Sequence, residues 1–532
     1  MSTAFIAIHR QYPGTLDEQK AKAVYANMPE TYRQWVKEET LVRYLTSTLR
    51  QSILWHDYEA GGTDAKAVQP LQFAAIRTDL LHQYLDEPMD IYCRLPGDKL
   101  PHPVAIAITR INPLHCEMYG VPEPVFFRLI QSEMNVPATC VAGQNSMKYD
   151  EEVTRFGFWR NLLPVYDREF KNNNSRWDLL PVLAAYSALN VPGIVWPLRE
   201  DDPSLRSLKL EYIAKSNGIT QDSAHNALDD VKALIDVSAL LQSSDQSLWD
   251  HFFSHRFKKR VAAQTNHLGM GLLISASNGA KNNFMAPLLL IGKVPGEDNK
   301  WVGVDLSQRD ALRSCYHLDV AEIKRRLYMK TEELDAEQCA RPPIKTFAIN
   351  KSPVFMPSEW VKKHEPALWK EEWQLLANNL SPQTDFLNKL RNVYVTEQYP
   401  PQDAELSLYE GFASPADAAK IQQFSWMNTT EVFSSPMTWD NPFYHTMWQR
   451  ARWKLAHAGV IAWGEGEYAL WCAHRHQRLM SNIPEGGKHE HVNLENVDAV
   501  LSETEMPDDL RSGYRDWLDA LRKELSSINR EI

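Results

Sequence analysis

The chain lacks the features that mark secreted, membrane and strongly basic proteins. Its six cysteines are scattered through 532 residues without a C-x-x-C pair, which argues against a disulfide framework and favours reduced thiols in a cytoplasmic protein. No run approaches the ~18 apolar residues of a membrane span, and the apolar start at residues 5–8 is too short for a signal peptide. The formal net charge is -11, so any nucleic-acid role requires a local basic groove.

What is present is enough apolar material for several cores. The length of 532 residues and the hydrophobic content of 44% predict roughly two to four domains. Charged residues make up 23%, so most of the chain should fold. Residues 1–48 read as an N-terminal helical extension, in which Trp35, Val42 and Leu45 recur at roughly helical spacing. Such an apolar stripe must be buried, so we expect the extension to dock on the chain's own surface or to mediate assembly.

Three further domains are predicted from the pattern of elements. Residues 49–245 mix strands and helices, as an α/β domain does. The expected strands are 52–59, 73–78 and 104–108, and the expected helices are 124–133, 151–160 and 178–189. Residues 246–382 carry short strands between Gly and Asn turns, at 269–275, 286–293, 301–305 and 344–349, which is typical of a small β-barrel or sheet. Residues 383–532 are helical and rich in tryptophan.

Two carboxylates share one face of the first of these strands. Asp57 and Glu59 lie two positions apart, and a strand sends alternate side chains to the same face. They repel each other unless a cation sits between them, and hard oxygen ligands suit Mg²⁺ or Mn²⁺. The alternative is a chance pair on a solvated strand face, which 68 acidic residues make common.

The segment His225-Asn226-Ala227-Leu228-Asp229-Asp230 supplies the other half of a metal site. Asp222 and Ser223 are candidate caps for a helix that places Asp230 about one turn from its start. Asp230 can bind metal while His225 takes a proton from water, because histidine titrates near neutral pH. A surface helix with a capping histidine is the alternative.

A third acidic position follows the apolar stretch at residues 140–142. Asp150 would add a carboxylate from a loop or helix start. Its neighbours Glu151 and Glu152 are explained as acids in a first helical turn, which the helix dipole favours.

In this order, D-x-E, a distant Asp and H-x-A-x-x-D resemble the DEDDh 3′-to-5′ exonucleases, and more narrowly the exodeoxyribonuclease I family. The narrower resemblance is carried by residues 56–59, 70–79, 150–155, 174–180 and 215–219, and more weakly by 255–256, 349–354 and 408–412. It spans most of residues 52–480. Three departures stand out: Ala60 replaces a threonine, Arg110 stands where the family tends to have glycine, and Glu151 replaces an aspartate.

The resemblance implies an α/β, ribonuclease-H-like exonuclease domain, then an SH3-like β-barrel domain and a helical C-terminal domain that clasp single-stranded DNA. It also implies that Asp57, Glu59, Asp150 and Asp230 hold two Mg²⁺ ions about 4 Å apart, with Mn²⁺ as a substitute. His225 would deprotonate the attacking water, and 5′-mononucleotides would leave from a 3′ end, in DNA repair or recombination.

Basic residues outside this set are candidate DNA contacts. The candidates are Lys209 and Arg206, which precede the histidine, the run Arg256, Lys258, Lys259 and Arg260, and the mixed run Arg450, Arg452, Trp453 and Lys454. Solvated charges or buried tryptophans are the alternative for each. The resemblance also implies that the protein binds the acidic tail of single-stranded DNA-binding protein, and the sequence does not identify the residues of that pocket.

Two other functions compete with this interpretation. An RNA 3′-exonuclease of the same superfamily would use the same ligands on a sugar that carries a 2′-hydroxyl. A DNA-bound interaction or defence module, recruited through residues 1–48, belongs to another class of protein. The long C-terminal half argues against the first, and the full catalytic set argues against the second.

Overall fold

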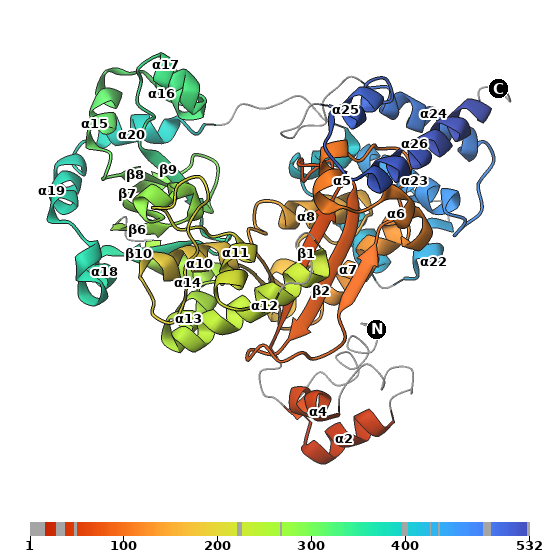
Figure 1. Ribbon diagram of the computed structural model, residues 1–532, viewed down its shortest axis with the longest axis horizontal. Coiled ribbons are helices and arrows are strands. Elements are labelled where there is room, and N and C mark those ends of the chain that lie inside the picture. Colours follow the sequence, from red (N-terminus) through yellow and green to blue (C-terminus); the bar gives the residue numbers. More distant parts are fainter. Residues whose placement is uncertain are drawn as a thin grey trace. The chain divides into compact units, whose positions relative to one another are not determined.

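The computed structural model describes residues 16–27, 38–46, 51–220, 226–265, 269–395, 403–425, 427–434, 437–481 and 491–528. The chain divides into two compact units (Figure 1). The first contains Met1–Ser175, Thr220–Asp236 and Pro400–Ile532, and the second contains Arg176–Ile219 and Val237–Tyr399. A helix with the length and apolarity to cross a membrane does not occur in the described ranges.

A mixed sheet is the frame of the first unit. Its strands are β1 (Ser52–Ala60), β2 (Pro70–Thr78), β3 (Met89–Tyr92), β4 (Thr139–Gly143) and β5 (Ser175–Asp178), in the order β3-β2-β1-β4-β5. Only Ser175 of β5 falls within the first unit. The central strand β1 runs antiparallel to β2 and parallel to β4. Every residue of β1 except Asp57 is buried, as expected for a strand with neighbours on both sides. The strands predicted at 52–59 and 73–78 are confirmed.

One face of this sheet is covered by two helices, α7 (Glu123–Met134) and α8 (Asp150–Arg160). Leu54 and Tyr58 of β1 point into a core that includes Phe127 of α7 and Phe156 of α8. Asp57 and Glu59 alternate with these residues along β1, so they lie on the opposite face. Packing on one side therefore fixes which side carries the acids.

The strand predicted at 104–108 is wrong, because this segment is the helix α5 (Pro103–Thr109). The side chain of His102 accepts a hydrogen bond from the Val104 amide at the start of the helix, and Pro103 takes the first helical position, where proline is tolerated. Arg110 ends the helix in the left-handed conformation, with φ of 57°. The helices predicted near 124–133, 151–160 and 178–189 are confirmed as α7, α8 and α10 (Leu179–Ala188).

Helices from the C-terminal part complete the first unit, where they lie beside the sheet in Figure 1. They are η6 (Ala404–Tyr409), α21 (Pro415–Phe424), α22 (Thr429–Ser434), α23 (Pro442–His457), α24 (Glu467–Leu479), α25 (Val497–Glu503) and α26 (Asp508–Ile528). The same unit also contains the short helices α6 (Pro113–Tyr119), α9 (Asp167–Phe170) and η1 (Lys171–Asn173), which come from the N-terminal part of the chain. The expected helical, tryptophan-rich character is confirmed, and Trp448, Trp453, Trp471 and Trp517 are buried.

A network of buried charges joins these helices to the sheet domain. Glu123 of α7 accepts from Arg160 of α8 at 2.7 Å and from Lys454 of α23 at 3.2 Å. Burial alone would raise the pKa of Glu123, but the two cations lower it to about 2. Glu405 of η6 likewise pairs with Lys99 at 3.3 Å. The charges of Lys454 and Glu405 are thus compensated by groups from the other part of the chain.

The N-terminal extension packs on the chain itself. Its described elements are α2 (Glu18–Ala26) and α4 (Glu38–Thr46). Ala21, Leu41 and Leu45 are fully buried in a small cluster with Leu85, which follows β2. This agrees with the expected docking of the apolar stripe, although Trp35 lies outside the described residues.

The second unit is built around an antiparallel sheet in the order β10-β6-β7-β8-β9. Its strands are β6 (Met270–Ile274), β7 (Met285–Lys293), β8 (Lys300–Asp305), β9 (Ile344–Ala348) and β10 (Val354–Pro357). Its helices include α10, α11 (Leu210–Ser216), α13 (Gln246–Ser254), α14 (Lys258–Thr265), α15 (Arg309–Ser314), α16 (Val320–Tyr328), α17 (Thr331–Ala336), α18 (Ser358–His364), α19 (Glu371–Leu380) and α20 (Thr384–Asn392). It also contains the 3₁₀ turns η2 (Ala276–Asn278), η3 (Ala280–Asn282), η4 (Cys315–His317) and η5 (Pro366–Leu368). The four predicted strands are confirmed, while β10 and the helices between β8 and β9 were not foreseen.

A substitution in α8 tests the packing that fixes the acidic face. A Cβ atom at Gly157 would lie 2.1 Å from the ring of Phe127. In an exposed helix, glycine to alanine gains about 1 kcal/mol. Here we expect Gly157→Ala to destabilise by about 1–3 kcal/mol, because the core must shift. The control is Gly411→Ala, where nothing lies within 4 Å. Equal denaturation midpoints for the two variants would contradict the packing.

Candidate metal centre

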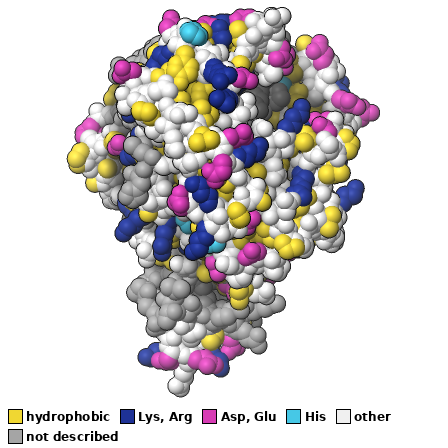
Figure 2. All heavy atoms as spheres, turned by 90° about the vertical axis from the view of Figure 1, so that its left-hand side faces the viewer, with side chains coloured by type: hydrophobic (Ala, Val, Ile, Leu, Met, Phe, Trp, Pro, Cys, Tyr) yellow, Lys and Arg dark blue, Asp and Glu magenta, His cyan; other side chains and the backbone are white. Residues whose placement is uncertain are grey.

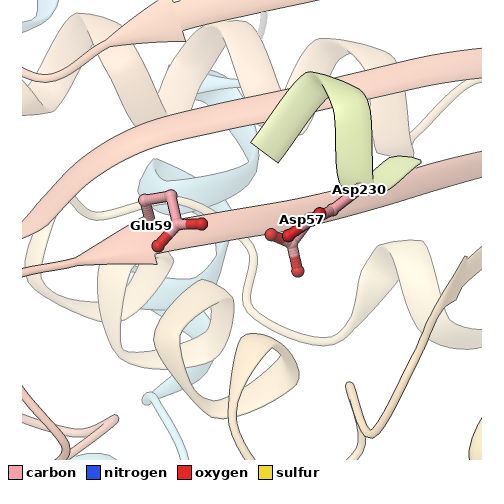
Figure 3. A group of neighbouring side chains, drawn as sticks. All are labelled: Asp57, Glu59 and Asp230. Atoms are coloured by element: carbon pink, nitrogen blue, oxygen red, sulfur yellow. The ribbon is translucent and has the colours of Figure 1, made fainter. Parts of the chain in front are cut away.

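Three carboxylates from two distant parts of the chain meet on the face of the sheet opposite to α7 and α8 (Figure 3). Asp57 and Glu59 project from β1, and Asp230 comes from the helix α12 (Ala227–Ser244). One carboxylate oxygen from each residue lies within 4.8 Å of the others. Among the described residues no other group of His, Cys, Asp and Glu has this arrangement. The pairing of the two halves expected from the sequence is therefore present.

The start of α12 aims Asp230 at the strand. The side chain of Asn226 accepts hydrogen bonds from the amides of Leu228 at 3.1 Å and Asp229 at 3.3 Å, so it caps the helix. Asp230 donates its amide to the Asn226 carbonyl at 3.0 Å, which places it one turn in, as predicted. The expected caps Asp222 and Ser223, and His225, lie outside the described residues. The positive end of the helix dipole favours a carboxylate at this place.

Crowding of the acids changes their protonation. Burial, and then the charge of Asp230, raises the pKa of Asp57 to about 8. Burial, and then Asp57, Asp230 and Asp150, raises the pKa of Glu59 to about 9. Both groups are therefore poor anions without a counter-ion. A divalent cation would restore their charged forms, and oxygen donors of this kind suit Mg²⁺ and Mn²⁺.

Asp150 lies close enough to act on Glu59 but is outside the three-carboxylate group. It begins α8 and is 5% exposed. Its neighbours have other partners: Glu151 forms a buried bidentate pair with Arg168 at 2.8 and 3.0 Å. Glu152 binds Arg155 at 2.9 Å and accepts from the Tyr409 hydroxyl at 2.5 Å. Glu151 and Glu152 thus have structural partners, beyond the dipole effect expected from the sequence.

Strand register adds residues that the sequence did not single out. Glu59 lies opposite Gln72 of β2, and Gln72 lies opposite Tyr92 of β3, so the three share a face. The row through Asp57 continues to Ala74 and Asp90 in the same way. No local motif marks these residues, because their relation depends on how three strands pair.

The predicted DNA contacts on the second unit have varied surroundings. Arg206 donates to the Ser187 carbonyl at 2.6 Å, and Arg256 is held between the rings of Phe253 and Phe257 at 3.6 and 4.2 Å. Lys209 is largely exposed, with its ammonium 4.9 Å from the Tyr212 ring. Three exposed cations remain, and within the described ranges they form no ion pair: Lys258, Lys259 and Arg260 in the first turn of α14.

The cations of the second basic run, residues 450–454, have partners within the chain. Arg450 binds Asp403 at 2.6 and 2.8 Å, Arg452 binds Glu467 at 2.8 Å, and Lys454 belongs to the buried network. Trp453 is 7% exposed. These contacts favour the alternative interpretation, because the cations neutralise acids of the chain itself and the tryptophan fills a core.

A mixed sheet whose central strand and a following helix bring acidic residues together is the frame of a metal-dependent exonuclease. Residues 54–238 match the family model described as "Exonuclease", and residues 256–396 match "Exonuclease I SH3-like domain". The chain is 33% identical over 374 residues to exodeoxyribonuclease I of Haemophilus influenzae, covering 69% of this chain and 78% of that protein. It is 35% identical over 385 residues to the Escherichia coli protein, with coverage of 70% and 79%. The chain belongs to the exodeoxyribonuclease I family.

Solved structures agree with this assignment. E. coli exonuclease I in complex with a dA16 oligonucleotide matches with a TM-score of 0.77 and 29% identity, over 90% of this chain and 100% of that chain. A zinc-bound complex of the same enzyme with single-stranded DNA has a TM-score of 0.77 and 29% identity, covering 90% of this chain and 99% of that chain. An exonuclease I complex with SSB-Ct matches at 0.74 and 28%, with coverage of 90% and 99%. The predicted fold, an exonuclease domain followed by an SH3-like domain, is confirmed.

The raised acid pKa values predict how metal-free stability changes with pH. Folding raises the pKa of Asp57 and Glu59, so the folded state holds protons that the unfolded chain releases, and stability falls as pH rises from about 4 to about 9. We expect Asp57→Asn in EDTA to raise Tm by a few degrees near pH 8.5, with less gain near pH 5.

Thermal unfolding across this pH range checks the prediction. Asp310→Asn, at a side chain that is 95% exposed, is the control and should leave the pH slope unchanged. Added Mg²⁺ should stabilise the wild type more than Asp57→Asn. A wild type whose slope matches that of Asp57→Asn would refute the electrostatic argument.

Proposed function

We propose that the protein is a Mg²⁺-dependent exonuclease that degrades single-stranded DNA from the 3′ end to 5′-mononucleotides. The observation that carries the proposal is the convergence of Asp57, Glu59 and Asp230 on one face of an exonuclease-family sheet. The relatives named above are exodeoxyribonucleases, and the solved relatives include complexes with single-stranded oligonucleotides. Family members depend on divalent metal; the choice of Mg²⁺, with Mn²⁺ as substitute, rests on the all-oxygen donor set.

We assign four carboxylates to the metal site. Asp57, Glu59 and Asp230 form the group that an ion would neutralise, and Asp150 completes it from the start of α8. The influence of Asp150 on the pKa of Glu59 supports its inclusion. Two divalent ions bound there would supply charge stabilisation for both the attacking and the leaving oxygen of a phosphodiester.

The chain's own groups have separate tasks in this reaction. The carboxylates hold and orient the ions, while β1 and α12 provide a rigid support for them. We assign the general base to His225, five residues before Asp230, because an imidazole can take the proton of the attacking water near neutral pH. The pairing of Glu151 with Arg168 keeps a further acid out of the site.

Phosphate contacts are proposed for Lys258, Lys259 and Arg260. The N-terminus of a helix carries a partial positive charge, so positively charged side chains there are unfavourable. Three cations without an ion pair in the first turn of α14 therefore indicate an anionic partner. Figure 2 shows Lys and Arg side chains gathered, with histidine among them, in the lower half of the face that it presents. Lys209, Arg206 and Arg256 are retained as weaker candidates, since the last two are held by neighbouring groups.

Partners and setting follow from the family. We propose single-stranded DNA as the substrate and the C-terminal tail of single-stranded DNA-binding protein as a partner, with a cytoplasmic role in DNA repair or recombination. All six cysteines are free, as in a reducing compartment. We retain the division into residues 1–48, 49–245, 246–382 and 383–532 as the proposed domains.

The polarity of digestion tests the function. Matched DNA and RNA strands, labelled at either end, are incubated with Mg²⁺, and a blunt DNA duplex is included. We expect mononucleotides to be released from the 3′ end of single-stranded DNA, with little attack on the duplex and a steep loss of affinity with salt. Release from the 5′ end, or a preference for RNA, would refute the proposal.

Two neighbouring aspartates provide a matched pair for the site. Asp230→Asn should lower turnover by at least ~10²-fold, because it removes a metal ligand. Asp229→Asn should retain activity, because Asp229 pairs with Lys232 at 3.0 Å on the helix surface. Both variants are compared for Mg²⁺ binding by calorimetry and for nucleotide release. Similar activity in the two would show that Asp230 is not a ligand.

A further inference from the structure

An aromatic track lies at the edge of the sheet that carries the acidic cluster. It consists of Tyr92 on β3 and His115 and Tyr119 on α6. The ring centroids of Tyr92 and His115 are 4.4 Å apart at 72°, and those of His115 and Tyr119 are 4.6 Å apart at 44°. The three rings are thus in contact from the sheet to the surface.

Register links this track to the catalytic carboxylates. Glu59, Gln72 and Tyr92 form one cross-strand row on the face that carries the acids, so Tyr92 is two strand spacings, about 10 Å, from Glu59. Gln72 donates its amide to Asp90 at 2.8 Å and to the Tyr92 hydroxyl at 3.3 Å. The buried Gln72 therefore fixes the tyrosine relative to the metal site.

The helix that carries the other two rings is also firmly held. Asn112 caps α6, Cys116 is buried against the sheet, and Glu117 accepts from Trp517 at 3.4 Å. His115 and Tyr119 are one turn apart, so they lie on the same side of the helix. Core packing does not explain this side, because Tyr119 is 63% exposed.

We propose that the aromatic track is a stacking subsite for a base of single-stranded DNA close to the scissile phosphate. The inference rests on the proposed function and adds residues that position the substrate. Exposed rings bind bases of any sequence through their faces, as an exonuclease without sequence preference requires. The carboxylate of Asp90 repels phosphates, so the track receives a base while the backbone follows the metal side.

Steady-state cleavage of oligonucleotides with one abasic position tests the subsite. The abasic position is moved stepwise from the 3′ end, and KM and kcat for the first cleavage are measured for wild type and Tyr119→Ala. We expect Tyr119→Ala to raise KM roughly 5- to 150-fold, with kcat within about twofold. Tyr119→Phe should restore KM, because it keeps the ring.

Met118→Ala is the matched control, since Met118 is 71% exposed on the same helix but outside the track. In the wild type, one abasic position should weaken binding by a similar factor, and Tyr119→Ala should abolish that dependence. Equal KM values for Tyr119→Ala and Met118→Ala, or an abasic effect that persists in Tyr119→Ala, would overturn the proposal. If the wild type released no nucleotides, the proposed function would fail, and fluorescence anisotropy with the same strands in EDTA would still decide the subsite.

Discussion

Repulsion between Asp57, Glu59 and Asp230 is the constraint on which the rest of the first unit depends. Burial and neighbouring charge raise the pKa of Asp57 to about 8 and that of Glu59 to about 9, so the metal-free site costs free energy at neutral pH. The strand β1 and the capped start of α12 keep the carboxylates together despite this cost. The metal-free protein is therefore less stable than it would be with these carboxylates further apart. In return it keeps a geometry that binds a cation, a compromise that is common where function and folding compete.

The arginines nearest to the acidic cluster are paired with other acids of the chain. Arg168 is fully buried close to the site, yet its guanidinium is occupied by both oxygens of Glu151. Arg155 is held in the same way by Glu169 and Glu152. Glu151, which departs from the aspartate that the family resemblance leads us to expect, thus occupies the guanidinium of Arg168.

Much of the fold and the metal half-sites could be predicted from the sequence, because both rest on local signals. Alternation predicted β1, and spacing placed Asp230 one turn into its helix. The prediction of a strand at 104–108 was wrong because the apolar residues there fit a strand as well as a helix. The helix is determined by Pro103 at its first position and by His102, which caps it. The role of Arg450 and Lys454 could not be foreseen, since their acidic partners lie up to 331 residues away in sequence. The positions of Gln72 and Tyr92 beside Glu59 could not be predicted for the same reason. They depend on the register in which three strands pair, and no short sequence motif records that register.

The buried charges around Glu123 have a consequence for how this enzyme can be divided. Lys454 and Arg478, from the C-terminal helices, neutralise Glu123, Asp98 and Glu405 inside the first unit. A fragment that ended after the SH3-like region would lose Lys454 and Arg478, and with them the helices that bury Glu123 and Asp98. It would also uncover apolar side chains such as Phe126 and Leu71, which pack with residues of the C-terminal helices. The acidic cluster and the C-terminal helices therefore belong to one compact unit, and a gene rearrangement that separated them would expose the core that they share.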